Sequence, residues 1–145
     1  ELVNLRCSDL FFDEGLVKVV GKGNKERFVP IGRIGQESVR RYLSIRAEGK
    51  KGFSDILFLN NRGTKLTRNM IFIIIRRGAE NAGLEKTISP HSLRHSFATH
   101  LVENGADISS VQQMQGHSSI TTTERYLHMS KKHLQQTLEK FHPRS

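Results

Sequence analysis

The chain has 145 residues, 36% of them hydrophobic, which is enough apolar material for one compact domain with its own core. Its 23 lysines and arginines against 14 aspartates and glutamates give a formal net charge of +9, so a polyanion, chiefly nucleic acid, is the expected partner. The single cysteine excludes an internal disulfide. No apolar run approaches the ~20 residues of a membrane span, so we expect a cytoplasmic protein.

The early part of the chain predicts a β-hairpin with a basic tip. Leu16–Val20 is short and rich in β-branched residues, as strands are. Residues 21–25 follow with two glycines and an asparagine, which suit a tight turn. Residues 26–31 then read as the returning strand, in which Pro30 indicates an edge strand or the end of a strand.

Two helices are predicted in the middle of the chain. The first covers residues 36–48, with apolar side chains spaced for one face, and Gly49 is expected to stop it. The second covers residues 69–81, and Thr67 is suited to cap it. Within it the apolar run 71–75 is ambiguous, because periodicity does not separate a buried helix from a buried strand.

A helix is predicted to start at Ser89 and Pro90, since proline suits the first turn of a helix. Leu93, Phe97 and Leu101 recur every fourth residue and are expected to form its buried stripe.

A shorter helix follows, for which Asp107 is a suitable cap and Gly116 a suitable end. We expect Ile108, Val111 and Met114 to point inward from this helix.

The C-terminal part predicts a helix over residues 122–129 and an amphipathic helix over residues 132–141. Leu134, Leu138 and Phe141 share one face of the latter, which can fold back on its own domain or dock on a neighbour. The order of a helix, a small antiparallel sheet and then helices predicts an α+β domain that is mostly α.

His91 and Arg94 lie three residues apart, so a helix places them on one face. A guanidinium forks onto two phosphate oxygens and an imidazole moves a proton, so the pair suits a phosphate group. Taken alone, the same pair is also typical of a surface histidine beside a solvated arginine.

Four segments of the sequence, taken together in their order and spacing, resemble the motifs of one known family. Residues 91–100 and residues 115–118 resemble the central signature and the glycine-histidine motif of the tyrosine recombinase (phage integrase) family. Tyr126, nine residues after His117, stands at that family's usual distance for the nucleophile, and residues 21–27 look like its catalytic-lysine turn. The resemblance covers nearly the whole chain and is closest to the Xer-type chromosome-dimer resolvases.

The resemblance implies the family's helical catalytic domain with a small antiparallel sheet, and DNA recombination or integration without a metal or other cofactor. A tyrosine hydroxyl attacks a DNA phosphodiester and forms a 3′-phosphotyrosyl bond, which releases a 5′-hydroxyl. Because the bond energy is kept, a different 5′-hydroxyl can reverse the step on another strand. Cations around the non-bridging oxygens and a general acid for the leaving oxygen take the place of a metal ion.

The resemblance also assigns roles to five residues of this sequence. Tyr126 is the expected nucleophile, and Arg94 is expected to clamp the scissile phosphate. His91 is expected to act as general base, and His117 to donate a hydrogen bond to a phosphate oxygen. Lys22, at the tip of the hairpin, is the expected general acid, since a lysine on a turn can swing in as DNA docks.

Other cationic and titratable side chains of the same segments have open roles. Lys25 lies three residues from Lys22 and could serve as the general acid instead. His95 and His100 are expected to support the structure.

We expect residues 1–145 to be a single C-terminal catalytic domain that is truncated at its N-terminal edge. Residues 1–5 read as the tail of a helix. The resemblance places a further active-site arginine just before Glu1, and a separate DNA-clasping domain before that. Losing one such donor costs roughly 10²–10³ in rate, so the fragment alone is expected to be weak or inactive. Gln115 is a smaller departure, because leucine is commoner there in the family.

The resemblance implies double-stranded DNA as partner, together with a tetramer on that DNA. The tetramer would be formed with other copies of the chain or with a related recombinase, through Leu134, Leu138 and Phe141 of the C-terminal helix. The expected place of action is the bacterial nucleoid, with no membrane contact. The sequence leaves open the DNA target and the outcome: dimer resolution, inversion or integration of a mobile element.

Two other classes of function remain open. A sequence-specific DNA-binding module without turnover would use the basic hairpin and residues 107–116 against the duplex backbone. A metal-dependent hydrolase would use His91 and His95, four residues apart on a helix. The hydrolase is disfavoured, because there is no H-E-x-x-H motif and Arg94 would stand beside the cation.

Overall fold

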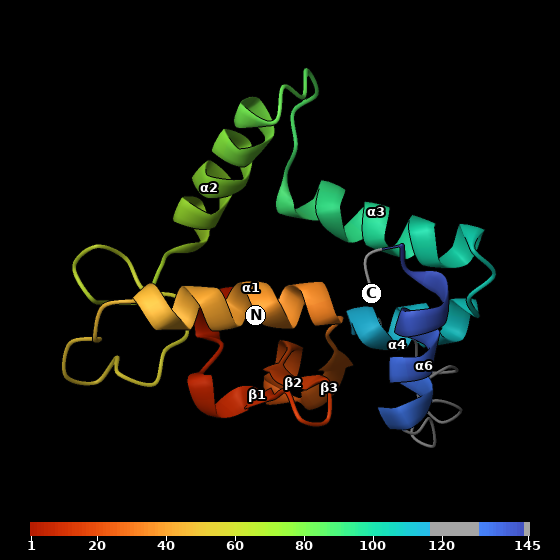
Figure 1. Ribbon diagram of the computed structural model, residues 1–145, viewed down its shortest axis with the longest axis horizontal. Coiled ribbons are helices and arrows are strands. Elements are labelled where there is room, and N and C mark those ends of the chain that lie inside the picture. The colour runs from red at the N-terminus through yellow and green to blue at the C-terminus, as the bar shows by residue number, and fades with distance from the viewer. Residues whose placement is uncertain (117–130, 144–145) are drawn as a thin grey trace.

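The structure, a computed structural model, describes residues 1–116 and 131–143 (Figure 1). The N-terminal part forms a three-stranded antiparallel sheet in the order β1-β2-β3. The strands are β1 (Leu10–Phe11), β2 (Leu16–Val20) and β3 (Glu26–Pro30). Single turns of 3₁₀ helix flank or connect them at Leu2–Asn4, Cys7–Asp9 and Lys22–Asn24.

The predicted hairpin is confirmed as β2 and β3. Leu16 pairs with Pro30, and β3 is an edge strand that ends at this proline, as its sequence indicated. The short strand β1, which pairs with the start of β2, was not predicted, because two residues are too few to show an alternating pattern.

The hairpin tip closes with a hydrogen bond from the backbone N–H of Gly21 to the carbonyl of Lys25, at 2.8 Å. Gly23 and Asn24 adopt positive φ angles of 75° and 58°. Glycine and asparagine tolerate this left-handed conformation better than other residue types, and therefore the turn forms here.

Five helices lie in the described part of the chain, and α3, α4 and α6 gather at one end of the molecule (Figure 1). Their bounds are α1 (Arg33–Ile45), α2 (Arg68–Asn81), α3 (Pro90–Glu103), α4 (Ile108–Gln115) and α6 (Lys131–Phe141). The predicted helix over residues 122–129 lies outside the described residues.

The N-caps predicted at Thr67 and Asp107 are confirmed, and the helix predicted to start at Ser89 and Pro90 is capped by Ser89. Thr67, Ser89 and Asp107 each accept a hydrogen bond from a backbone N–H two or three residues further on, at 3.2, 3.2 and 3.4 Å. Each cap satisfies one of the N–H groups that a helix start leaves without a partner. The ambiguous run 71–75 is therefore helical, as part of α2.

The first helix begins and ends three residues earlier than predicted, at Arg33 and Ile45. Its end is set by Arg46, which is extended and donates to the carbonyls of Ser54 and Ile56 at 3.0 and 3.2 Å. These bonds direct the chain into the following loop before it reaches Gly49, the predicted stop.

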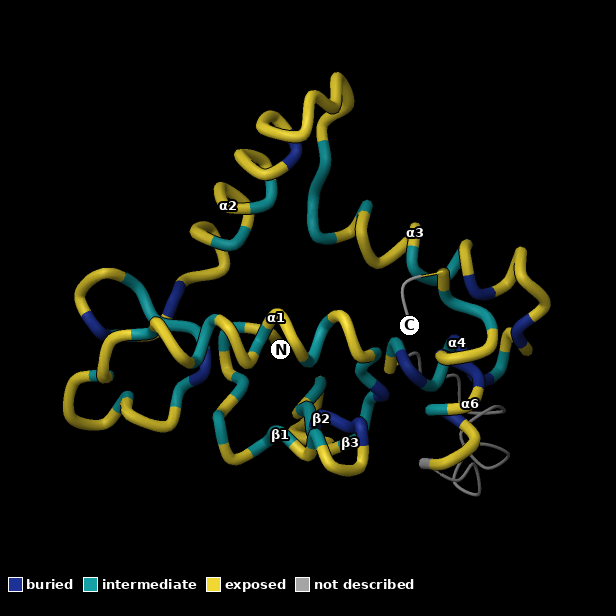
Figure 2. The backbone as a smooth tube through the Cα atoms, viewed as in Figure 1, coloured by how far each residue is buried: buried dark blue, intermediate teal, exposed yellow. Residues whose placement is uncertain are grey.

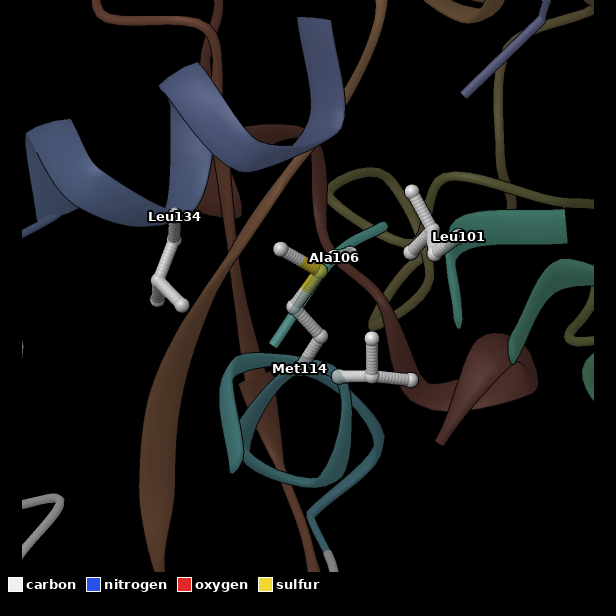
Figure 3. Packing of buried hydrophobic residues seen from close by; sticks show 5 residues of the cluster. Leu101, Ala106, Met114 and Leu134 are labelled. Atoms are coloured by element: carbon white, nitrogen blue, oxygen red, sulfur yellow. The ribbon is translucent and has the colours of Figure 1, made fainter. Parts of the chain in front are cut away.

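The core lies where α3, α4 and α6 meet, and α6 also packs on β3. Figure 3 shows the side chains that converge there, which include Leu101, Met114 and Leu134 at 0%, 2% and 2% exposure. Leu138 is also buried, and Phe141 packs against the same cluster. The apolar face of the C-terminal helix thus folds back on its own domain, the first of its two predicted alternatives.

Two positions that were predicted to be buried are exposed. Leu93 is 51% exposed and Ile108 is 58% exposed. The residues of α3 in or against the core, such as Phe97 and Leu101, come later in the helix than Leu93. Ile108 is the first residue of α4, whereas Val111 and Met114 of the same helix are buried as predicted.

Helix α2 is exposed along most of its length (Figure 2). Its apolar residues Phe72 and Ile74 are 42% and 49% exposed, so α2 contributes little to the core of the described residues. Among the described helices, none combines the length and the apolar character that a membrane span requires.

We predict that Leu134→Ala destabilises the domain by about 2–5 kcal/mol, because it removes a buried side chain and leaves a cavity. Chemical denaturation of the protein without DNA measures this cost. Leu84→Ala is the matched control, since Leu84 is 53% exposed, and it should be nearly neutral. An equally small effect at Leu134 would show that α6 does not rest on its own core in solution.

Candidate functional site

The structure describes three of the five predicted site residues. Lys22 is exposed at the tip of the hairpin, at the start of its 3₁₀ turn. His91 and Arg94 both lie on a helix, α3, as predicted, and both are exposed. His117 and Tyr126 lie outside the described residues.

The start of α3, which carries His91 and Arg94, is capped by its own side chains. Ser89 and Ser92 form a reciprocal capping box, in which each side chain accepts from the backbone N–H of the other at 3.2 Å. Pro90 occupies the first turn, where its missing N–H costs nothing. The two site residues follow within two turns of this cap, on the part of the helix whose start the cap secures.

Arg94 is bound to the end of α4. Its Nη2 donates to the backbone carbonyl of Gln115, and the Nε2 of Gln115 donates to the carbonyl of Arg94 at 2.9 Å. The Gln115 side chain is thus half of a two-way bridge between α3 and α4. Leucine, which is commoner there in the resembled family, lacks the donor that makes the second bond.

Arg27 of β3 reaches the same end of α4. Its Nε donates to the carbonyl of Met114 at 3.4 Å. Its two Nη atoms donate to the two carboxylate oxygens of Glu1 at 2.7 and 3.0 Å, a bidentate pair. The side chains of Arg27 and Glu1 are 20% and 37% exposed, so solvent only partly screens the pair.

The electrostatics of this cluster show in Glu1. Hydrogen bonds from Arg27 lower the pKa of the Glu1 carboxyl below its ordinary value, against the opposing effect of partial burial. The positive charges of Arg27, of the N-terminal ammonium group and, least, of Arg94 lower it further. The carboxylate therefore lies within the field of both guanidinium groups.

Two glycines leave the space that Arg27 and Glu1 occupy. A Cβ atom on Gly116 would lie 2.8 Å from Cζ of Arg27, and one on Gly21 would lie 3.0 Å from Oε1 of Glu1. Gly21 directly precedes Lys22, and Gly116 directly precedes His117. Arg27 therefore touches both segments that lead into predicted site residues.

Sequence reasoning missed Arg27, Glu1 and the role of Gln115. Arg27 lies inside the lysine-turn motif, but no local pattern indicates that it pairs with Glu1, 26 residues away. The glycine before His117 was the available signal, because a glycine at a helix end can serve a close approach as well as a turn.

The described cluster is rich in positive charge, as a phosphate site requires. Within residues 1–116 and 131–143, no three side chains of His, Cys, Asp and Glu are grouped so as to hold a metal ion.

Comparison with known families gives a consistent result. The model of the phage integrase family matches residues 1–133. The chain is 46% identical over 147 residues to the tyrosine recombinase XerD of Staphylococcus haemolyticus, covering 100% of the chain and 50% of that protein. It is 43% identical over 148 residues to XerD of Halalkalibacterium halodurans, covering 100% and 49%. The chain thus spans about half the length of the curated relatives it matches.

Solved structures are similar in fold. The crystal structure of XerA recombinase matches with a TM-score of 0.76 and 35% identity, over 100% of this chain and 52% of that one. The site-specific recombinase XerH, bound to its difH substrate before cleavage, matches with a TM-score of 0.65 and 32% identity, over 88% and 37%.

Proposed function

The chain belongs to the phage integrase family of tyrosine recombinases, and we propose on this basis that it carries out site-specific DNA recombination. The observation that supports the proposal most is the meeting of three separate motifs. The hairpin motif contributes Arg27, the central signature contributes Arg94, and both donate to the carbonyl end of α4, where the glycine-histidine motif begins. Segments far apart in sequence are thus brought together around a cationic cluster.

In the proposed reaction, the Tyr126 hydroxyl attacks the scissile phosphorus while its proton passes to His91. The bond from phosphorus to the 5′-oxygen breaks, and this oxygen takes a proton from Lys22. The products are a 3′-phosphotyrosyl bond and a free 5′-hydroxyl, so no net oxidation or hydrolysis occurs. The exposed position of Lys22 on a turn suits a group that must approach bound DNA.

Arg94 and His117 stabilise the charge that develops on the non-bridging oxygens. A guanidinium and an imidazole donor, held in place before the reaction, lower the barrier because they need not reorganise during it. The bridge between Arg94 and Gln115 provides this pre-organisation for the guanidinium. No cofactor enters the proposed step.

We predict that the full-length gene product forms a covalent adduct with DNA and that Tyr126→Phe abolishes it. The substrate is a nicked suicide duplex carrying a site equivalent to the difH substrate of XerH, and the reaction contains EDTA. A denaturing gel detects the SDS-resistant adduct. The Tyr126→Phe variant should bind the same duplex unchanged, which separates cleavage from binding. A wild-type protein that binds the site but forms no adduct would instead indicate the DNA-binding module.

The proposed partners are double-stranded DNA and further recombinase protomers in a tetramer on that DNA, at the bacterial nucleoid. Leu134 and Leu138 are buried in the chain's own core and Phe141 packs against it. Contact with a neighbour through this face therefore requires α6 to leave its own core and take the equivalent place on the next protomer. Such an exchange re-forms the same contacts and costs little once protomers are aligned on DNA.

We predict that deletion of residues 131–145 abolishes tetramer formation on DNA while binding to a single half-site persists. Native gels with one-site and two-site duplexes separate the two effects, and circular dichroism checks that the shortened chain is folded. Full-length Tyr126→Phe should assemble normally. Unchanged assembly of the shortened, folded chain would refute the role of the C-terminal helix.

A further inference from the structure

The carbonyl end of α4 is completed by side chains from other elements. A helix leaves its last four carbonyls without intrahelical partners. The backbone N–H of Gly116 donates to two of these carbonyls, which leaves those of Met114 and Gln115. Arg27 donates to the first and Arg94 to the second. Positive charge at this end of a helix is also stabilising, because it lies beside the negative end of the helix dipole.

Arg27 is held in one orientation by contacts on several sides. Its fork onto Glu1 fixes the plane of the guanidinium, and its Nε points to Met114. Gly116, at a φ of 72°, lies against one part of the group, and a Cβ atom on Gly21 would lie 3.2 Å from its Nη1. A lysine has no planar fork and cannot reproduce these three directed bonds.

The contact of Arg27 with Gly116 bears on the backbone that leads into His117. Gly116 is the last described residue before His117, and the group packed against it is the Arg27 guanidinium. An arginine that moves would release both the carbonyl of Met114 and the glycine turn after it. The same movement would relax Gly21, the residue before Lys22.

We propose that Arg27, anchored by Glu1, is a positioning residue for DNA cleavage. This inference rests on the proposed function. Arg27 acts on the reaction through the end of α4, from which His117 follows, and through the turn that carries Lys22. Its donors are bonded to Glu1 and Met114, so direct contact with the phosphate is not part of the proposed role. Its effect is therefore expected in the rate of cleavage once DNA is bound.

Single-turnover cleavage by the full-length gene product tests this. We expect Arg27→Lys to lower the cleavage rate at saturating suicide substrate by about 10- to 100-fold, since small misplacement of catalytic groups has effects of that size. The dissociation constant for DNA should change by less than about twofold, because the positive charge is kept. Assays are run well below the melting temperature of each variant, so that a loss of folded protein does not mimic the effect.

Two further variants accompany this test, one as a matched control and one as a second probe of the same contact. Arg33→Lys is the matched control, because Arg33 is 84% exposed and its ion pair is with Glu37 on the same helix, so it should cleave at the wild-type rate. Glu1→Gln keeps Arg27 but removes the charge that anchors it, and it should lower the cleavage rate in the same sense as Arg27→Lys. A wild-type cleavage rate in Arg27→Lys would overturn the proposal, and a wild-type rate in Glu1→Gln alone would overturn the anchoring by Glu1.

A comparison of two glycines tests the contact without any enzyme assay. Gly116 and Gly83 both have a φ of 72°, but a Cβ atom on Gly83 would meet nothing within 4 Å. Gly116→Ala should therefore lower the melting temperature more than Gly83→Ala does. In an Arg27→Ala background this difference should vanish, because the clashing group is gone. If Gly116→Ala still lowers the melting temperature by the same excess in that background, Arg27 is not the group that the added Cβ atom meets.

These outcomes distinguish a failure of the proposed function from a failure of the positioning role of Arg27. If the wild-type protein forms no Tyr126-dependent adduct, the proposed function fails, and with it the role of Arg27 in cleavage. If the wild-type protein cleaves and the Arg27→Lys variant cleaves equally fast, recombination stands and the positioning role is wrong.

Discussion

Arg27 from the sheet and Arg94 from α3 both donate to the carbonyl end of α4. This arrangement ties together three segments that are remote in sequence, and it fixes where the candidate site can form. It depends in turn on the core, because Met114 buries its side chain between α3, α4 and α6 while its carbonyl faces Arg27. One residue thus connects the packing of the domain to the geometry of the site.

Placing two guanidinium groups near one helix end has an electrostatic cost, which Glu1 reduces. Its carboxylate pairs directly with Arg27 and also feels the charge of Arg94, and its pKa is lowered accordingly. The cluster retains an excess of positive charge, in line with the net charge of +9 for the whole chain. The same guanidinium groups thus supply positive charge and hold the end of α4.

Local signals predicted much of this fold. The caps at Thr67 and Asp107, the helix start at Ser89 and Pro90 and the glycine-rich turn of the hairpin depend on a few neighbouring residues, so the sequence alone was enough to find them. Burial at Leu93 and Ile108 was predicted wrongly, because helical periodicity gives a face but not the elements that cover it. The pairing of Arg27 with Glu1 depends on tertiary structure, which no local pattern encodes. Lys22 lies in the predicted turn and His91 and Arg94 lie on the predicted helix, while their catalytic roles remain predictions.

The most direct test of the account is hydrogen–deuterium exchange of the protein without DNA, in the wild type, Arg27→Gln and Arg33→Gln. If Arg27 secures the end of α4, Arg27→Gln should speed exchange of the amides of residues 112–116, while the paired amides of β2 and β3 keep their protection. Arg33→Gln, which removes the same charge from an exposed position, should leave α4 unchanged. Equal exchange of residues 112–116 in all three proteins would contradict the claim that Arg27 holds the end of this helix.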